Sequence, residues 1–273
     1  MKKIIVPTDF SEQADNALRV AADMARENDG EIFLLHQVDL PLHLANNASS
    51  NLPEAVFFMK LAKEKFDNLL TADYLDGVTI HGDVQTGAAF SGIMDTVRRH
   101  EADIIVMGSH GADGVKNLFL GSNAEKVVRN SEIPVLVVKD RKKRLDVNDM
   151  VFATDLDANS TGALKEAASF ANKTNCNLHL LYVNTPSNFM TTEKAETKVK
   201  EYLKNVNINN YDYTIWNDHS IEEGVFNYTK AIKGDIIGMA THGRRGISHF
   251  FNGSVSEDIV NHSALPVVTF RIK

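Results

Sequence analysis

The sequence predicts an α/β protein of two tandem domains, each a five-stranded, parallel, doubly wound sheet with helices on both faces. Short apolar segments alternate with amphipathic segments along the chain, which is typical of strands joined by right-handed helical crossovers. The second half of the chain repeats the first, so the same architecture is expected twice. With 273 residues, 43% of them apolar, the chain is long enough for two cores of ordinary size.

The repeat is visible in two pairs of segments. KKIIVPTDFSEQADNALRVAADMA, at residues 2–25, is echoed by NDMVFATDLDANSTGALKEAASFA at residues 148–171. MGSHGADGVKNLFLGSNAEKVVRNSEIPVLVV, at residues 107–138, is echoed by MATHGRRGISHFFNGSVSEDIVNHSALPVVTF at residues 239–270. The repeat places the first domain at residues 1–144 and the second at residues 145–273.

The two copies differ in length between these segments. Asp9 and Asp155 lie 146 residues apart, whereas Gly121 and Gly253 lie 132 residues apart, so the second copy is shorter by 14 residues. The turn-rich segment at residues 41–53 is the expected insertion in the first copy. It is either a lid or contact loop, or a plain surface loop.

Within each copy, strands and helices are expected in alternation. A continuous apolar run at residues 102–109 predicts a strand buried on both faces. Helices are expected from Ser11, over residues 56–75 and 86–100, and from Ser122. The expected strands cover residues 4–7, 31–38, 78–84, 102–109 and 133–138, then 150–154, 178–183, 213–217, 235–240 and 265–270.

Charge and cysteine content narrow the classes of protein. A formal charge of −7 gives no electrostatic reason to expect nucleic acid or an acidic membrane as a partner. The one basic cluster, at residues 139–144, is interpreted as a solvated linker. Cys176 is the single cysteine, which excludes an intramolecular disulfide and suits a reducing compartment. With neither a signal peptide nor a membrane span visible, a cytoplasmic protein is expected.

In a doubly wound sheet the ligand crevice lies beyond the carboxyl ends of the strands, where the strand order reverses. Pro7, Thr8 and Asp9 follow the first strand, Gln37 lies at the end of the second, and residues 108–111 follow the fourth. Gly108, Gly111 and Gly121 allow close approach of the backbone to a ligand, and Ser122 begins a helix with outward-facing amides. These features predict an anion site that binds phosphate.

The spacing Gly108, two residues, Gly111, nine residues, Gly121 and Ser122, together with VPTDFSE near the start, resembles the ATP-binding branch of the universal stress protein family. Two copies cover nearly the whole chain, as in the tandem-domain members. The resemblance implies two Rossmann-like domains of the adenine nucleotide α-hydrolase-like type.

The resemblance also implies ATP in the first crevice. Asp9 would take the ribose or adenine side, the backbone near Gln37 would meet the adenine, and the glycines with Ser122 would surround the ribose and phosphates. Mg²⁺ could accompany the nucleotide, although no acidic cluster requires it and no metal site of the protein itself is expected. The residues implied are Pro7, Thr8, Asp9, Gln37, Met107, Gly108, His110, Gly111, Gly121, Ser122 and Asn123.

The second copy departs from this pattern, so a second site is doubtful. Ala240 stands at the position of Gly108, and the methyl group of Ala240 would obstruct a ligand that passes close by. An arginine near the phosphates would instead strengthen binding. The corresponding residues are Thr154, Asp155, Val183, Ala240, Gly243, Arg244, Gly253, Ser254 and Val255.

Structural roles explain some of the same residues. Ser122 with Glu125, and Ser254 with Glu257, have the spacing of a capping box. Asp9 is also a candidate cap of the first helix, and His110 and His242 are expected to shape loops rather than catalyse.

The expected function is that of an ATP-binding sensor or signalling module of the stress response, not of a turnover enzyme. The chain contains no HExxH, no GxSxG and no P-loop motif. The alternatives are a weak ATPase or a protein that phosphorylates itself on Ser122, and a scaffold with vestigial sites. Strands 133–138 and 265–270 are expected to pair the two halves as a pseudo-dimer and to support a homodimer between chains.

Overall fold

A computed structural model describes residues 1–38, 52–109, 120–139, 147–204, 206, 208, 210–242 and 254–272. The described chain divides into two compact units. The first holds the described residues up to 109, with 121–126 and 138–139, and the second holds 120, 127–137 and the described residues from 147 onward.

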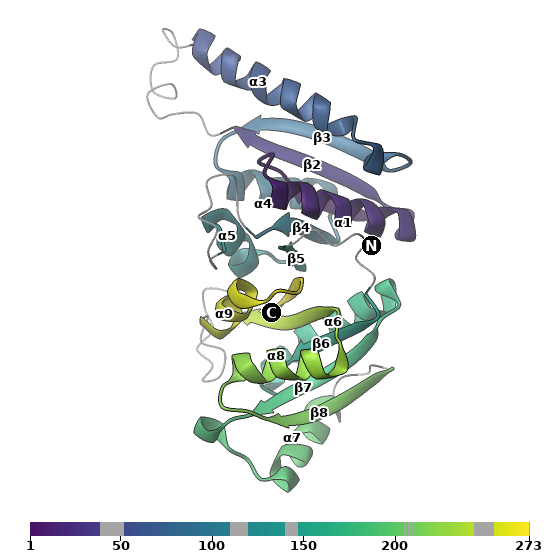
Figure 1. Ribbon diagram of the computed structural model, residues 1–273, viewed down its shortest axis with the longest axis vertical. Helices are drawn as coiled ribbons and strands as arrows, with labels where there is room; N and C mark the ends of the chain where they lie inside the picture. Colours follow the sequence, from purple (N-terminus) through teal and green to yellow (C-terminus); the bar gives the residue numbers. More distant parts are fainter. Residues whose placement is uncertain are drawn as a thin grey trace. The chain divides into compact units, whose positions relative to one another are not determined.

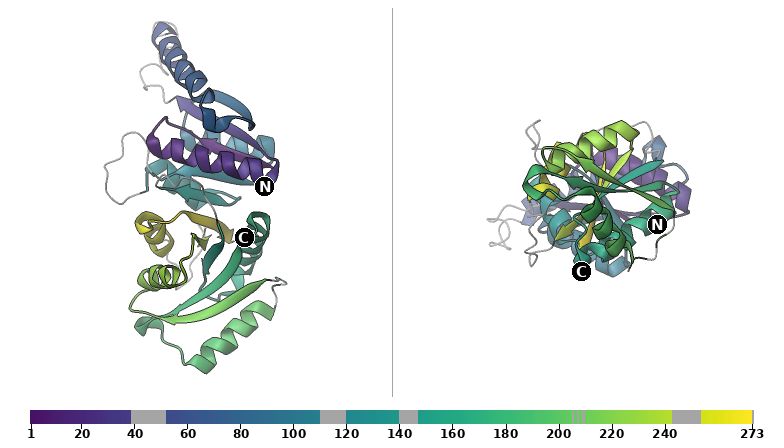
Figure 2. Two further views of the ribbon diagram at one scale, coloured as in Figure 1. Left: turned by 45° about the vertical axis from the view of Figure 1, so that its right-hand side comes forward. Right: turned by 90° about the horizontal axis from the view of Figure 1, so that it is seen from below.

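The first unit is a parallel sheet in the order β3-β2-β1-β4, with helices on both faces (Figures 1 and 2). The helix α1 packs on β1 and β4, α4 packs on β1 and β2, and α3 packs on β2 and β3 at the edge of the sheet. The elements are β1 Lys3–Pro7, α1 Glu12–Asn28, β2 Glu31–Val38, α3 Leu52–Leu70, β3 Thr79–Thr86, α4 Ala89–His100 and β4 Ile104–Gly108. The helix α5, Ser122–Asn130, begins in this unit, and its residues from 127 onward belong to the second unit.

The second unit repeats this plan with five parallel strands in the order β10-β9-β6-β7-β8. The strand β5, Val135–Val138, adds to it: residues 135–137 pair antiparallel with β10. The elements are β6 Asp149–Ala153, α6 Thr161–Thr174, β7 Asn177–Asn184, α7 Thr192–Lys204, β8 Tyr211–Asn217, α8 Ile221–Ile232, β9 Ile236–His242, α9 Ser254–His262 and β10 Val267–Ile272.

Local sequence explains the first helix. The hydroxyl of Ser11 accepts a hydrogen bond from the Ala14 amide and caps the N-terminus of α1, while Asp29 ends the helix in the left-handed conformation. Small residues at the buried face, among them Ala17 and Ala21, are fully buried. They allow α1 to lie close to the sheet, which places its N-terminus beside the end of β4.

The predicted fold class is confirmed, with three corrections in detail. The length difference between the copies is not confined to residues 41–53, because α3 has 19 residues and its counterpart α7 has 13. Residues 41–51 lie outside the described chain. The strand β10 pairs with β9 on one side and β5 on the other, so it is not an edge strand available to another chain. The helix expected over residues 56–75 begins earlier, at Leu52, and ends at Leu70.

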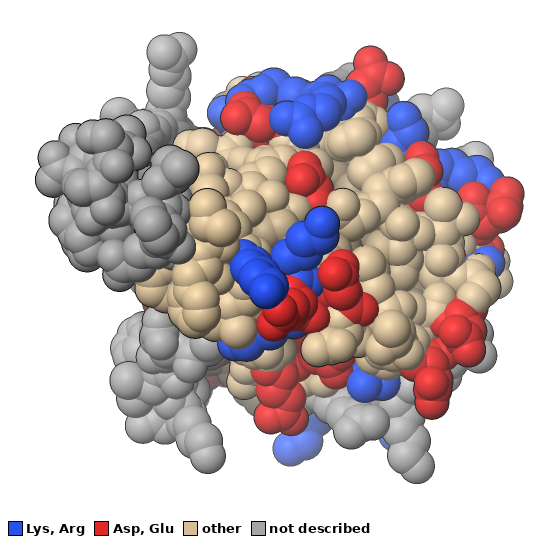
Figure 3. Space-filling view, turned by 90° about the horizontal axis from the view of Figure 1, so that it is seen from above, with Lys and Arg blue, Asp and Glu red and all other residues tan. Residues whose placement is uncertain are grey.

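The surface of the first unit around α3 is mixed in character. Basic and acidic side chains are interspersed on the face drawn in Figure 3 and leave uncharged areas between them. On α3, Val56 and Phe57 are 59% and 61% exposed, while Ala62 and Phe66 are buried against the sheet. Among the described helices, none is both long and apolar enough to cross a bilayer.

Candidate functional site

The chain reverses its direction of winding at β1 in the first unit. From β1 the chain adds β2 and then β3 on one side, and it returns to place β4 on the other side. The gap beyond the carboxyl ends of β1 and β4 is therefore the switch point at which doubly wound sheets bind ligands. Pro7, Thr8, Asp9, Met107 and Gly108 all lie at these two strand ends, as predicted.

The turn after β1 is held by its own side chains. The Thr8 hydroxyl accepts from the Phe10 amide at 3.1 Å, and the Asp9 carboxylate accepts from the Ser11 amide at 3.0 Å. Phe10 has φ of 65°, which is unusual for a residue with a side chain. Asp9 therefore orients Ser11, and Ser11 rather than Asp9 caps α1. Asp9 is exposed, just beyond the carboxyl end of β1.

The Phe10 ring explains how the left-handed turn is tolerated. It lies 4.3 Å from the His36 ring and 6.5 Å from Phe66 of α3, measured between ring centroids. His36 is itself fixed, because its Nδ1 lies 2.8 Å from the Thr8 carbonyl oxygen. Aromatic packing of this kind contributes about 0.5–1.5 kcal/mol beyond burial, which offsets the strain of one residue at positive φ.

Gly108 is required by packing as well as by any ligand. A Cβ atom on Gly108 would lie 2.7 Å from the backbone carbon of Gln13 and 2.8 Å from its carbonyl oxygen. These are backbone atoms of α1 and cannot swing aside. A glycine here therefore allows the end of β4 to lie against the first turn of α1, so its presence does not by itself report nucleotide binding.

The N-terminus of α5 is tied to the switch point. The Gly121 amide donates to the Ser109 carbonyl at 2.8 Å, and the Ser109 amide donates to the Val138 carbonyl at 3.1 Å. The Gly121 carbonyl accepts the first helical bond, from the Glu125 amide at 2.9 Å, so Gly121 is the N-cap of α5. Ser122 lies one residue further in, and the predicted Ser122–Glu125 capping box is wrong.

This geometry leaves the first turn of α5 facing the switch point. The amides of Ser122, Asn123 and Ala124 have no carbonyl within the helix to which they could donate. Together with the helix dipole, they make the N-terminus of α5 favourable for an anion. The Gly121 amide is not part of this set, since Ser109 already engages it.

Gln37, at the end of β2, carries an acceptor without a donor. Its Nε2 donates to Oε1 of Gln85 at 2.8 Å, and Nε2 of Gln85 donates to the Asp83 carboxylate at 2.6 Å. Because a carboxylate only accepts, Asp83 fixes the orientation of both amides. Oε1 of Gln37 is buried and has no hydrogen-bond partner among the described residues. The space for this side chain exists because residue 92 is a glycine, whose Cβ would lie 1.7 Å from Nε2.

The second unit repeats the turn but not its surroundings. The Thr154 hydroxyl accepts from the Leu156 amide at 3.0 Å, the Asp155 carboxylate accepts from the Asp157 amide at 3.0 Å, and Leu156 has φ of 58°. Asp155, however, is only 5% exposed.

Ala240 of the second unit is accompanied by a change in the facing helix. The segment Ala158–Ser160 forms a 3-10 turn, and α6 begins only at Thr161, whereas α1 is helical from the equivalent of Ala158. In the first unit, a methyl group on Gly108 would collide with the backbone of Gln13. In the second unit, the 3-10 turn occupies the position that corresponds to Gln13. The hydroxyl of Ser256 donates to the Ala240 carbonyl at 3.3 Å and ties α9 to β9.

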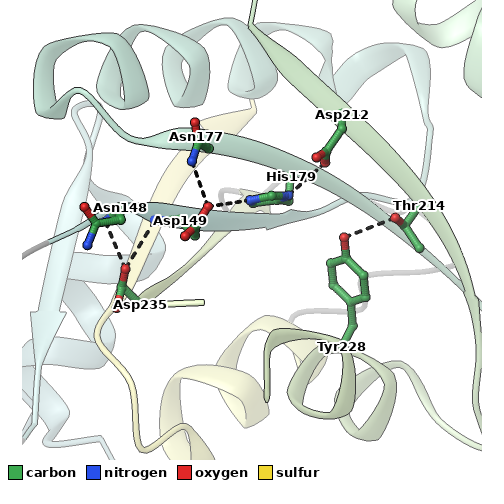
Figure 4. A network of polar contacts seen from close by, with 8 residues as sticks. All are labelled: Asn148, Asp149, Asn177, His179, Asp212, Thr214, Tyr228 and Asp235. Carbon is green, nitrogen blue, oxygen red and sulfur yellow. Dashed lines mark hydrogen bonds and ion pairs between the residues drawn. The ribbon is translucent and has the colours of Figure 1, made fainter. Parts of the chain in front are cut away.

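A second polar cluster lies at the opposite, amino-terminal edge of the second sheet (Figure 4). His179 of β7 lies between two carboxylates, with Nε2 2.8 Å from Asp149 and Nδ1 2.8 Å from Asp212. The hydrogen bond from His179, followed by that from Asn177, holds the pKa of Asp149 below its usual value. Since both ring nitrogens face carboxylates, both contacts are hydrogen bonds only when the imidazole carries two protons.

Some predicted residues cannot be placed. His110, Gly111, Gly243, Arg244 and Gly253 lie outside the described chain, as does the side chain of Ser254. Val183 packs against α8, where a Cβ on Gly224 would lie 2.4 Å from its methyl group, and Val255 is half-buried in α9. Among the residues that sequence reasoning missed are Phe10, Gln85 and Gly92. The repetition of Gly92 as Gly224, 132 residues later, was a signal that could have revealed the last of them.

Comparison with known proteins agrees with this two-fold plan. A model of the universal stress protein family matches residues 1–139 and again residues 147–271. The chain therefore belongs to the universal stress protein family, with two tandem copies of the family domain.

Two relatives match about half of the chain, and one solved structure matches nearly all of it. One universal stress protein of Methanocaldococcus jannaschii is 34% identical over 147 residues, which is 52% of this chain and 84% of the relative. A second from that organism is 35% identical over 153 residues, or 50% of this chain and 94% of the relative. The crystal structure of a universal stress protein from Archaeoglobus fulgidus has the same fold throughout, with a TM-score of 0.74 at 22% identity, covering 99% of this chain and 98% of that one.

Proposed function

We propose that the first unit binds ATP at the switch point between β1 and β4, and that the protein acts as a nucleotide-responsive sensor or signalling module of the stress response. The observation that carries this proposal is the tether from Gly121 to Ser109, which holds the N-terminus of α5 at the end of β4. A helix N-terminus at a switch point favours the phosphates of a nucleotide without needing a lysine.

Different residues of the chain would bind different parts of the nucleotide. The amides of Ser122, Asn123 and Ala124 would donate to phosphate oxygens, and the exposed carboxylate of Asp9 would accept from ribose hydroxyls. By the family resemblance, His110 and Gly111 would also belong to the site, and Mg²⁺ could accompany the nucleotide.

Adenine would lie at the end of β2, where the backbone near Gln37 would meet the base. The Gln37 side chain is already engaged, because its Nε2 donates to Gln85 and its Oε1 is buried beside Gly92. Backbone groups can pair with the edge of a base without any movement of this side chain.

Thermal unfolding with and without nucleotide tests the proposal. ATP at 100 times its Kd should stabilise the chain by about 2.7 kcal/mol, and the melting temperature should rise accordingly. An unchanged melting temperature at millimolar ATP would contradict nucleotide binding and favour the scaffold.

Substitutions at two glycines, Gly121 and Gly162, distinguish a loss of ATP binding from a general loss of stability. Gly121→Val adds a branched side chain at the N-cap of α5, where it would obstruct the phosphates and lower stability by about 1 kcal/mol. The matched control is Gly162→Ala in α6, where a Cβ meets nothing within 4 Å. We expect the first variant to lose the ATP-dependent rise in melting temperature and the control to keep it. If both variants keep it, the phosphates bind elsewhere.

Labelled ATP distinguishes a sensor from an enzyme. Incubation should yield neither free phosphate nor labelled protein at rates above those of Ser122→Ala. Protein labelling that disappears in Ser122→Ala would instead establish self-phosphorylation on Ser122, and release of free phosphate would establish an ATPase.

We further propose that the protein is cytoplasmic, that the pairing of β5 with β10 joins the halves as a pseudo-dimer, and that any homodimer uses another surface.

A further inference from the structure

The two switch points differ in what covers them. Asp9 is exposed, whereas the equivalent Asp155 is 5% exposed although it makes the same turn. Two residues of α7, the helix that corresponds to α3 in the second unit, contact the turn that contains Asp155.

Tyr202 of α7 closes one side of the second crevice. Its hydroxyl lies 2.8 Å from the Ser160 hydroxyl. The Ser160 hydroxyl has the Asp157 carbonyl oxygen as its nearer acceptor, at 2.8 Å, and the Asp155 carboxylate at 3.4 Å. Tyr202 also hydrogen-bonds to Thr154, and only 5% of the residue is exposed. Burial raises the pKa of Tyr202 and of the neighbouring Tyr182, as expected for phenols removed from water beside a carboxylate.

Lys198 closes the same crevice from one turn earlier in α7. Its Nζ donates to the carbonyl oxygen of Asp155 at 3.1 Å. A lysine four residues before Tyr202 lies on the same face of the helix, so both side chains reach the turn after β6 together. The cation therefore lies where a ligand's own groups would meet this turn.

The connection from β7 to α7 is also fixed. The Asn184 amide nitrogen donates to the Met190 carbonyl at 3.1 Å, and the Met190 amide donates back to the Asn184 side-chain oxygen at 2.8 Å. Asn184 additionally donates to Asn217 of β8 at 2.9 Å. These bonds anchor the segment that leads into α7, so the helix cannot swing away without breaking them.

We propose that Lys198 and Tyr202 exclude nucleotide from the second unit, so that each chain binds a single ATP, in the first unit. This inference rests on the proposed function, because it takes ATP as the ligand. The closure of the second crevice by α7 does not depend on the identity of the ligand, because it is argued from the contacts of Lys198 and Tyr202 with the turn around Asp155. The two side chains act as specificity determinants that make the tandem copies unequal.

The test compares the two equivalent aspartates by isothermal titration calorimetry with ATP. Asp9→Asn and Asp155→Asn remove the same charge and keep the oxygen that holds the turn. The wild-type chain should bind one ATP, Asp9→Asn should weaken binding about tenfold, and Asp155→Asn should leave it unchanged. The fluorescence of Trp216, the single tryptophan, which pairs with Val183 beside the second crevice, should not respond to ATP.

A second experiment, done without nucleotide, tests the closure of the second crevice separately from ATP binding. Limited acylation followed by mass spectrometry should label Lys198 more slowly than the exposed lysines Lys194 and Lys200 of the same helix. Two bound ATP molecules, weakening by Asp155→Asn, or a rapidly labelled Lys198 would each overturn the inference. No ATP binding together with a slowly labelled Lys198 would sink the proposed function but uphold the closed crevice.

Discussion

Asp9 and Asp155 make the same hydrogen bond in the same turn, yet only Asp9 is open to solvent. The opposite edges of the two sheets differ in a similar way. Phe33 of β2 stacks between His81 and His100, with ring centroids 4.9 and 4.0 Å away, whereas the equivalent His179 lies between two aspartates. Backbone features are thus shared between the units, while the side chains at both sheet edges have diverged.

The difference shows which constraints belong to the fold. Asp103 accepts from the amides of Lys2 and Lys3, and Asp235 accepts from the amides of Asn148 and Asp149, so both units fix the start of the first strand identically. Features that satisfy backbone groups recur because an unpaired buried amide is costly in either unit. The side chains around the two equivalent aspartates do not recur, and our proposal places the functional difference there.

The largest expected effect comes from exchanging the residues at the end of the fourth strand. Gly108→Ala should destabilise the chain by about 3 kcal/mol, because its methyl group would overlap backbone atoms of Gln13. The reverse change, Ala240→Gly, removes a methyl group without a collision and should cost about 1 kcal/mol. Chemical denaturation of both variants measures the asymmetry. If the two variants were destabilised equally, the first turn of α1 would have to shift to make room for the methyl group, as the 3-10 turn before α6 does for Ala240.

The sequence predicted the strands, the repeat and the strand ends at the switch point well, because alternating apolar segments and paired motifs are local signals. It could not reveal the contacts of Lys198 and Tyr202 with the turn around Asp155, since these residues belong to a helix whose length differs from that of α3. Gly108 was also interpreted too narrowly. A glycine near a ligand and a glycine against a helix have the same sequence signature, and only the distance to Gln13 identifies the second role.

A substitution in the cluster of His179, Asp149 and Asp212 should have an intermediate effect on the free energy of unfolding. His179→Phe introduces the residue of the first unit and leaves Asp149 and Asp212 without their shared donor, at a cost of about 2 kcal/mol at pH 7. The folded pKa of Asp149 is lowered, so its stabilisation is present above the unfolded value near 3.8 and is lost as the pH falls through the folded value.

Urea denaturation at a series of pH values tests this prediction. The gap in unfolding free energy between wild type and His179→Phe should be larger at neutral pH than at acidic pH, and it should narrow below pH of about 4. A gap that stays constant down to pH of about 2 would show that packing, not the ion pairs, determines the cost.

The smallest effect should be the same in both units. Asp103→Asn and Asp235→Asn each replace a charged acceptor of two backbone amides by a neutral one, at a cost of about 1 kcal/mol. The two values should agree within about 0.5 kcal/mol, as measured by thermal or chemical unfolding. A clear difference between them would mean that the shared backbone feature supports the two units unequally.

The most direct measurement is a crystal structure of the chain grown with a non-hydrolysable ATP analogue. We predict density for one nucleotide per chain, with its phosphates at the N-terminus of α5 and its base beside Gln37, while Lys198 and Tyr202 remain in contact with the turn at Asp155. Density in the second crevice, or an analogue bound away from the switch point of the first unit, would contradict the account.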